Sequence, residues 1–482
     1  MIKKLLIPLL IFFLAFVLRA YKLDVRPLGF TWDEAALGYN AYSLFLTGKD
    51  EYREKLPIVL KSFGDYKPGL YAYLAVPSVA FLGLNEFATR LPSALLGSGL
   101  VLVIFLLGHS LFSRSVGALA AFLLAINPWA IHFSRGAWET NLSLFLTSLG
   151  LILFLRHQKI HNSSFILLSS LFMGLTLWSY QAAKFMTPVI LLALFFIAKS
   201  KKQLVVPWVL FLLVASPIVV GLSTQSGRLN TLSVFNYTRS KESVENILDQ
   251  GNDSLISYLL FHSESLDQFR GVIERYLNHF SPRYLFFEGD WSNIRHTTAY
   301  YGYFHPVEVI TILLGLYWVI KRPSRGSFLL FFWLVTSPIA SSLSRDVVSG
   351  VRSFPMVIPL TLLSAVGLSK LLQSKILFFL FISALGFFTI YYLDLYYVHT
   401  PHYAASAWLY PYKRAIQLVN NNIDSFDKVI FTNTLGQPYI FVLFYNQVDP
   451  RLYQPWANIS QSATGDVGEV ASWGKYVFKK VD

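Results

Sequence analysis

A chain of 482 residues would hold roughly three soluble domains of about 150 residues each, but its composition is that of a membrane protein. Hydrophobic residues make up 54% of the chain and charged residues 14%, whereas a soluble domain carries about 25% charged residues. This balance excludes a disordered chain, a disulfide-rich secreted fold and a nucleic-acid-binding module. The absence of cysteine also excludes thiolate catalysis, iron–sulfur clusters and cysteine zinc sites.

Eleven apolar stretches are long enough to cross about 30 Å of hydrocarbon, which predicts an all-α polytopic membrane protein. They are 5–21, 91–110, 115–133, 139–155, 163–180, 183–198, 204–222, 303–320, 327–343, 354–369 and 376–393. Alternate connections between them are purely basic: Lys3 and Lys4; Arg114; Arg156 and Lys159; Lys199, Lys201 and Lys202; Lys321, Arg322 and Arg325; Lys370 and Lys375. Basic loops stay in the cytoplasm, so the pattern predicts a multi-pass protein of the cytoplasmic (inner) membrane with a cytoplasmic N-terminus.

A further apolar stretch, 68–84, decides the topology, because counting it as a span would invert every later loop. Pro68, Gly69 and Pro77 interrupt it, which favours a juxtamembrane or re-entrant helix. We therefore expect that it does not cross. The alternative is that it crosses and that a weak segment such as 183–198 does not.

The outer face then carries the loops 22–90 and 223–302, the turn around 134–139, and the segment 394–482. Residues 1–393 are the predicted transmembrane domain. Residues 394–482 predict a small soluble α/β domain, with an amphipathic helix at 406–422, strands at 427–433 and 475–481, and an apolar helix at 438–446. The pattern stops abruptly at Asp482, so we expect a domain that is cut short.

Charged residues avoid the centres of the spans and gather at their outer ends, which favours catalysis at the membrane surface over conduction. FTWDEAALGY at 30–39 places Asp33 and Glu34 at a helix start, and FSRGAWETN at 133–141 carries Arg135 and Glu139. Each acid is alternatively a charge that stabilises a helix N-terminus. In DYKPGLYAYL at 65–74, Lys67 is suited to a phosphate headgroup, or alternatively snorkels at the interface.

Two further outer turns carry cations. SYQAAK at 179–184 ends in Lys184, which either binds a lipid phosphate or anchors a helix end. SLSRDVVSGVRSFP at 342–355 contains Arg352, which is either a second phosphate contact or the partner of Asp346. The stretch 279–296 is rich in polar and aromatic residues and is expected to shape a cleft for an acceptor, but its histidines are too far apart in sequence to predict a metal site.

The order of these motifs, together with NEFATRLPSALLG at 85–97 and LFSR at 111–114, resembles the GT-C membrane glycosyltransferases. The similar branch contains the protein O-mannosyltransferases and bacterial aminoarabinose transferases (glycosyltransferase family 39), and the resemblance covers about residues 1–200. It implies a multispan helical core and a sugar donor linked to a polyprenyl phosphate. It also implies that Asp33 is the catalytic aspartate, that Glu139 is a second acid and that Lys67 is the lysine of a KP motif. Tyr66 precedes that lysine where the family often has an acid, which leaves any ion-pair or metal role there in doubt.

The chemistry predicts an inverting transfer of a sugar from a polyprenyl phosphate to an acceptor at the outer face. A base must deprotonate the acceptor, and cations must steady the departing phosphate. We expect Asp33 as the base and Glu34 or Glu139 to position the acceptor. Lys67 is expected to meet the phosphate, together with Arg135, Lys184 or Arg352.

The expected partners are the membrane, the lipid-linked sugar as co-substrate and a protein, glycan or lipid acceptor, with no nucleic acid. No cofactor is predicted with certainty, and a divalent metal shared by Asp33 and Glu139 is left as an open idea. Two other functions stay open: a lipid-linked polysaccharide polymerase or ligase, which would not depend on Asp33, and a non-enzymatic lipid flippase or scaffold, which would need a polar groove through the bilayer.

Overall fold

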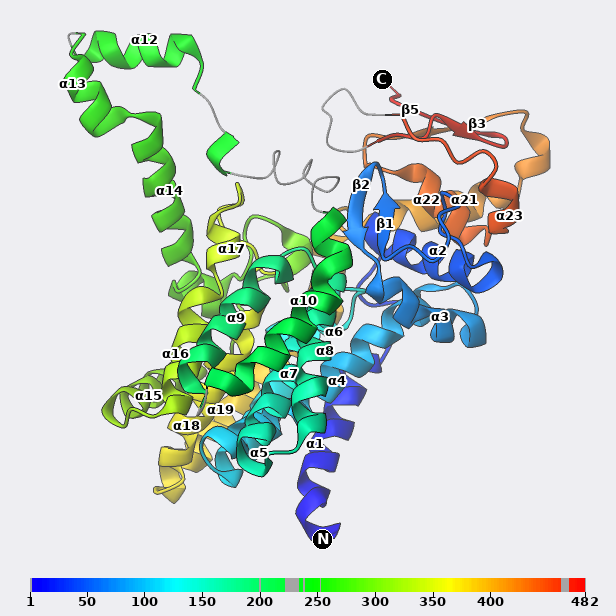
Figure 1. The fold of residues 1–482 in the computed structure, drawn as a ribbon. Coiled ribbons are helices and arrows are strands. Elements are labelled where there is room, and N and C mark those ends of the chain that lie inside the picture. The colour runs from blue at the N-terminus through cyan, green and yellow to red at the C-terminus, as the bar shows by residue number, and fades with distance from the viewer. Residues whose placement is uncertain are drawn as a thin grey trace.

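The computed structural model describes residues 2–198, 201–221, 234–236, 239–251, 253–460 and 468–481. Most of the chain forms a helical bundle, with the N-terminus at one end and the C-terminal sheet at the other (Figure 1). Four predicted features lie wholly or partly outside the described residues: Lys199, the last residue of the stretch 204–222, part of the loop 223–302 (residues 223–233, 237, 238 and 252), and Asp482.

All eleven predicted stretches are helical over most of their described length. The bundle consists of α1 (Ile2–Ala20), α4 (Glu86–Leu111), α5 (Arg114–Ile126), α6 (Pro128–Ser134), α7 (Glu139–Ile160), α8 (Ser163–Leu175), α9 (Ala183–Ile197), α10 (Val205–Val220), α15 (Glu308–Lys321), α16 (Arg325–Thr336), α17 (Ile339–Ser342), α18 (Val357–Leu371) and α19 (Lys375–Asp394). Short 3-10 and π turns join or flank the helices: η1 (Thr176–Trp178), η2 (Lys201–Leu204), η4 (Val234–Asn236), η5 (Tyr258–His262), η6 (Arg283–Phe287), η7 (Ile294–His296), η8 (Phe354–Met356), η9 (Leu395–His399) and η10 (Ile423–Ser425).

Among the described helices, four are long and apolar enough to cross a membrane, and the bent pair α5 and α6 makes a fifth if it is one span. The others are shorter, so the count of eleven spans stays a prediction. The exposed surface of α19 nevertheless indicates a lipid environment. Its side chains Phe379, Phe387 and Ile390 are 70%, 65% and 71% exposed, and a contiguous apolar face of this kind is unstable against water.

The break between α5 and α6 follows from two adjacent residues. Pro128 lacks an N–H group and so cannot continue the hydrogen bonding of α5. The Asn127 side chain instead accepts from the backbone N–H of Ala130 at 2.9 Å and caps α6. The two helices therefore meet at 59°, which directs α6 and the turn after it toward the outer end of α1.

The stretch 68–84 forms α3 (Leu70–Leu82), which packs against α2 (Trp32–Thr47) and α4. Its 13 residues span about 20 Å at 1.5 Å per residue. This is less than the roughly 30 Å of a hydrocarbon core, but helices of predicted spans such as α8 and α16 are equally short, so the prediction that this helix does not cross stays a prediction.

The end of the bundle opposite the N-terminus carries two small sheets (Figure 1). β1 (Val59–Ser62) and β2 (Asp65–Pro68) form an antiparallel hairpin, and β3 (Val429–Thr432) pairs in parallel with β5 (Tyr476–Lys479), which pairs antiparallel with β4 (Ser472–Trp473). Around them lie α20 (Thr400–Ala404), α21 (Tyr410–Asn420), α22 (Pro438–Tyr445) and α23 (Pro450–Tyr453). The predicted helices and strands of the C-terminal segment are therefore present.

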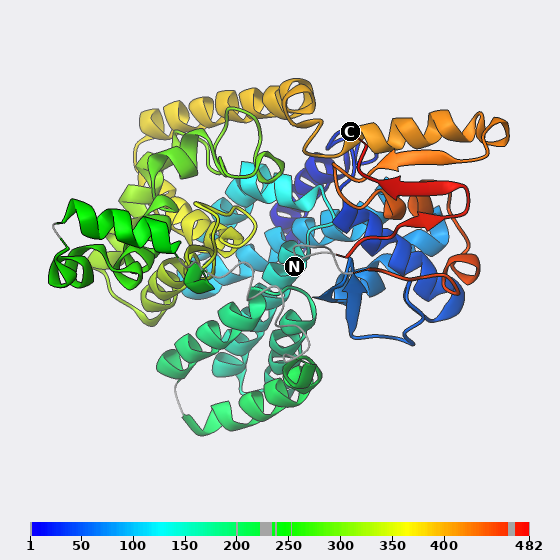
Figure 2. The same ribbon diagram turned by 90° about the horizontal axis from the view of Figure 1, so that it is seen from above.

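The C-terminal segment does not have a core of its own. Its apolar side chains share one cluster with those of residues 30–88, for example Phe30 with Phe444 and Phe63 with Tyr439. The predicted domain boundary at 393 and 394 also falls within a continuous helix that runs from Lys375 to Ala404. Seen from above, the C-terminal sheet lies beside the first outer loop, whereas α12 (Lys241–Gln250), α13 (Leu255–Ser257) and α14 (Glu264–Asn278) lie on the opposite side of the bundle (Figure 2).

Candidate active site

The first acidic motif lies at the start of α2, beside the hairpin that carries the KP motif. Asp33 is in the first turn of this helix, and its carboxylate forms an ion pair with the ammonium group of Lys67 on β2. Phe63 and Gly64 give the hairpin its tight turn, because both have a positive φ, at 56° and 84°, as a type I′ turn requires. The Asp33 side chain is 35% exposed and that of Lys67 is 12% exposed, so solutes can reach this pair.

Glu34 is buried and has a structural environment. The guanidinium of Arg90 donates to its two carboxylate oxygens at 2.8 and 3.0 Å. The backbone N–H groups of Thr31 and Ala137 donate to the same oxygens at 3.1 and 3.0 Å, the first as part of a capping box. Because both oxygens are engaged and shielded, we do not carry Glu34 forward as a catalytic or acceptor-positioning group.

Glu139 is the first residue of α7 and is half-buried. The bond from the Ala137 N–H group to Glu34 holds the turn before Glu139 against the start of α2, where Asp33 lies. Burial raises the pKa of the Tyr71 hydroxyl well above its ordinary value, and the charges of Glu34 and Glu139 add to this shift. Both acidic motifs therefore border the same region.

Arg135 joins the turn after α6 to the C-terminal end of α1 by hydrogen bonds. Its side chain is buried, and it donates to the Tyr396 hydroxyl at 3.2 Å and to a set of backbone carbonyl groups. These belong to Leu18, Arg19, Tyr21, Lys22 and Arg26. A phosphate would have to displace them, so the structure gives Arg135 a structural role in place of the expected phosphate contact.

The turn that contains Lys184 lies against the KP hairpin. The Gln181 side chain donates to the carbonyl oxygen of Tyr66 at 2.8 Å, one residue before Lys67. Lys184 itself is half-buried in the first turn of α9. The structure thus brings this motif to the same end of the bundle as Asp33 and Lys67.

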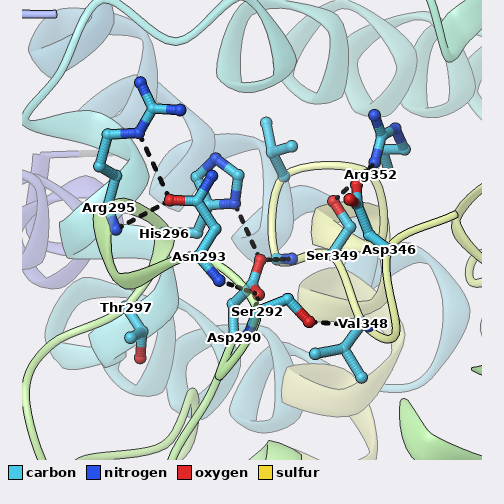
Figure 3. Close-up of polar contacts among 12 residues, drawn as sticks. Asp290, Ser292, Asn293, Arg295, His296, Thr297, Asp346, Val348, Ser349 and Arg352 are labelled. Carbon is cyan, nitrogen blue, oxygen red and sulfur yellow. Dashed lines mark hydrogen bonds and ion pairs between the residues drawn. The ribbon is translucent and has the colours of Figure 1, made fainter. Parts of the chain in front are cut away.

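Arg352 lies between α17 and η8. Its guanidinium pairs with Asp346, the alternative that the sequence left open, and donates to the hydroxyls of Ser344 and Ser349 at 3.3 and 3.4 Å (Figure 3). The hydroxyl of Thr140 donates to the carbonyl oxygen of Val351 at 3.0 Å. Arg352 therefore lies next to the first turn of α7, which begins with Glu139.

A narrow cavity joins these elements. Its polar lining comes from Thr140, Ser143, Thr147, Tyr180 and Arg352, and its apolar lining from Leu144, Ala182, Ala183, Met186, Ile190, Trp333 and Pro355. The lining thus combines one cation and several hydroxyl groups with apolar side chains.

Two groups of this region were not predicted. One is Glu51, which is fully buried and accepts from the Asn40 side chain at 3.4 Å. Burial raises its pKa to about 8, the charge of Asp50 adds to the shift, and Lys67 and Lys61 oppose it. The segment GKDEYREK looks like a solvated charged loop in the sequence, and no periodic signal marks Glu51 as buried.

The second unpredicted group is a hydrogen-bonded contact between His296 and Asp290. The Nδ1 atom of His296 lies 2.8 Å from a carboxylate oxygen of Asp290 (Figure 3). Sequence spacing could not identify it, because the two residues lie in an irregular loop without helical or strand periodicity. Among the described residues, no three His, Asp or Glu side chains are grouped closely enough to hold a metal ion.

Comparison with known proteins gives these positions a context. A family model described as dolichyl-phosphate-mannose-protein mannosyltransferase matches residues 66–221. No curated protein sequence matches the chain. Among solved structures, ArnT from Cupriavidus metallidurans in the apo state matches with a TM-score of 0.57 and 13% sequence identity, over 91% of this chain and 84% of ArnT.

The same ArnT bound to undecaprenyl phosphate matches with a TM-score of 0.55 and 13% identity, over 92% of this chain and 84% of ArnT. The oligosaccharyltransferase AglB from Archaeoglobus fulgidus, in complex with an inhibitory peptide and a dolichol-phosphate, matches with a TM-score of 0.52 and 14% identity, over 92% of this chain and 63% of AglB. ArnT and AglB are both GT-C glycosyltransferases. This chain has the GT-C fold. Within the GT-C fold, the matched segment 66–221 contains Lys67, Glu139, Lys184 and most of the cavity lining.

Proposed function

We propose that this protein is an inverting glycosyltransferase that moves a sugar from a polyprenyl-phosphate donor to an acceptor. The observation that carries the proposal is the convergence of the Asp33–Lys67 pair, the Glu139 turn and the cavity below Arg352 at one end of the bundle. The structures of ArnT with undecaprenyl phosphate and of AglB with a dolichol-phosphate support a lipid-linked donor.

The proposed reaction is a single displacement. The acceptor hydroxyl or amine attacks the anomeric carbon opposite the phosphate, and the new bond to this carbon forms as the bond from the carbon to the phosphate oxygen breaks. The acceptor proton passes to the carboxylate of Asp33, and the bonding electrons leave with the lipid phosphate. Glu139 positions the acceptor. Lys67, Lys184 and Arg352 meet the negative charge that grows on the phosphate.

Placement in the membrane follows from the charge pattern. We propose that the active site faces the outer side of the cytoplasmic membrane, because the basic connections lie at the other ends of the helices. The natural chain has no cysteine, so single-cysteine variants give a direct test. An impermeant thiol reagent added to intact cells should label Lys55→Cys and should label Ser164→Cys only after lysis. The reverse pattern would overturn the orientation.

The base assignment is tested with purified protein in lipid nanodiscs and polyprenyl-phosphate mannose as donor. Asp33→Asn should lower turnover by about 100-fold or more, since general acid–base catalysis contributes about 10²–10⁴-fold, and should not weaken undecaprenyl phosphate binding. Asp24→Asn, an exposed acid of the same outer loop, is the matched control. Undiminished turnover of Asp33→Asn would refute the assignment.

The same assay separates the alternatives. A polysaccharide polymerase or ligase would keep its activity without Asp33, and a flippase would move the lipid without transferring the sugar. Lys67→Met should weaken undecaprenyl phosphate binding about tenfold, which corresponds to about 1.4 kcal/mol. Lys61→Met, on the partner strand of the same hairpin, should not.

A further inference from the structure

The loop from Asp290 to His296 is organised around one buried carboxylate. The first oxygen of Asp290 accepts from the backbone N–H groups of Ser292 and Asn293 at 3.1 and 3.0 Å. The second accepts from the N–H group of Gly350 at 2.8 Å and lies 2.8 Å from Nδ1 of His296 (Figure 3). The carboxylate accepts this bond, so Nδ1 is the donor, and in that tautomer Nε2 is the acceptor nitrogen of the ring.

This loop touches both acidic helix starts. The His296 ring lies edge-on to Trp138, with 5.4 Å between ring centroids, and Trp138 immediately precedes Glu139. The guanidinium of Arg295 lies 5.3 Å from the ring centroid of Trp32, which immediately precedes Asp33. Consecutive residues of one loop therefore reach the two sides of the proposed site.

His296 differs from His279 and His305, in which both ring nitrogens form hydrogen bonds. His279 bonds to the carbonyl oxygen of Arg275 and to the N–H group of Ser349, and His305 bonds to the hydroxyl of Tyr301 and to the carbonyl oxygen of Ile126. Both rings are buried. In the part of the chain that the structure describes, Nε2 of His296 has no hydrogen-bond partner, and the side chain is 12% exposed.

We propose that His296 is an acceptor-positioning residue. Its Nε2 atom accepts a hydrogen bond from a second polar hydrogen of the acceptor, next to the one that passes to Asp33, and Asp290 fixes the tautomer and the ring orientation. The proposal rests on the proposed function and adds to it a contact for the acceptor, supplied by the outer loop. Asp290 also ties this contact to the turn that carries Arg352, through Gly350.

Two substitutions separate this role from a structural one. The amide of an asparagine at 296 can still reach Asp290 but not the position of Nε2, whereas the amide of a glutamine reaches the position of Nε2 but not Asp290. The assay is the release of free mannose from polyprenyl-phosphate mannose, with water as the acceptor. His296→Asn should lower turnover by about 100-fold, the lower end of the range for one positioned acid–base group. His296→Gln should lose less than about tenfold, and undecaprenyl phosphate affinity should stay within about twofold for both.

His399→Asn is the matched control, because His399 pairs with Asp394 at 3.4 Å in an exposed position, and it should behave as the wild type. Wild-type turnover by both His296 variants would overturn the proposal. Loss by His296→Gln with activity kept by His296→Asn would also overturn it, since only the bond to Asp290 would then matter.

A second measurement does not depend on turnover. Diethyl pyrocarbonate should modify His296 about tenfold faster than the buried His279 and His305, because both nitrogens of those two rings are hydrogen-bonded and Nε2 of His296 is not. Equal rates, read by mass spectrometry of peptides cut from the modified protein, would overturn the proposal. If the wild type releases no mannose, the proposed function fails, and the modification rates alone decide whether His296 faces the site.

Discussion

The buried pair of Glu34 and Arg90 gives the sharpest test of how the acidic motif at 33 and 34 divides its roles. Glu34→Gln removes the charge that receives two bonds from Arg90, at 2.8 and 3.0 Å, and leaves an unpaired guanidinium in a buried place. Breaking a buried pair by removing one partner costs about 3–5 kcal/mol. The glutamine also has an NH₂ group in place of one carboxylate oxygen, and this group cannot accept the bond that the N–H group of Thr31 or Ala137 donates to Glu34. We therefore expect a cost in the upper part of the range of about 3–5 kcal/mol.

The assay is equilibrium unfolding in a mild detergent, followed for Glu34→Gln, Arg90→Met and the double variant. The two single changes should each destabilise the protein strongly, and the double variant should be less destabilised than their sum, because the partners interact directly. Asp33→Asn, one residue away and partly exposed, should unfold within about 1 kcal/mol of the wild type. If Glu34→Gln keeps wild-type stability while sugar transfer is lost, then Glu34 acts in the reaction and the structural assignment is wrong.

Three further predictions follow from single contacts. Burial raises the pKa of Glu51 to about 8, so the folded state holds a proton that the unfolded state releases. The free energy of unfolding should therefore fall by up to about 1.4 kcal/mol per pH unit as the pH rises from about 5 to 8. Glu51→Gln should flatten this slope, and an unchanged slope in pH-dependent unfolding would contradict the burial argument. Thr31→Ala removes the cap of α2 and should cost about 1 kcal/mol in the same measurement, while a cost near zero would mean that the cap adds nothing. Gly367→Ala would place a methyl group 1.9 Å from the carbonyl oxygen of Thr311 on α15, so it should lower the yield of folded protein from membranes, whereas Gly386→Ala, with open space around it, should not.

The helices of the bundle could be predicted from the sequence, because length and apolar composition are local properties. All eleven apolar stretches are helical, and the C-terminal pattern of two helices and two strands is present. The grouping of Asp33, Lys67 and Glu139 could also be predicted, since the alternation of basic loops places these motifs on one face.

The partners of individual charges could not be predicted in the same way. Glu34 pairs with Arg90, 56 positions away, and Arg135 binds carbonyl groups more than 100 positions earlier. A local pattern indicates that a charge lies near a helix end but not which side chain lies opposite. For that reason Glu34 and Arg135 looked like reactive groups, while the Asp290–His296 pair and the buried Glu51 were not singled out.

The shared core of the outer part has a consequence for biogenesis. Residues 30–88 leave the ribosome early, yet the apolar side chains that cover them come from residues 409–478, which are made much later. At a synthesis rate of about 5–20 residues per second, the early loop waits tens of seconds for its partner. We expect a holdase chaperone to protect it during that interval, and a ribosome stalled before residue 409 to leave this loop sensitive to protease.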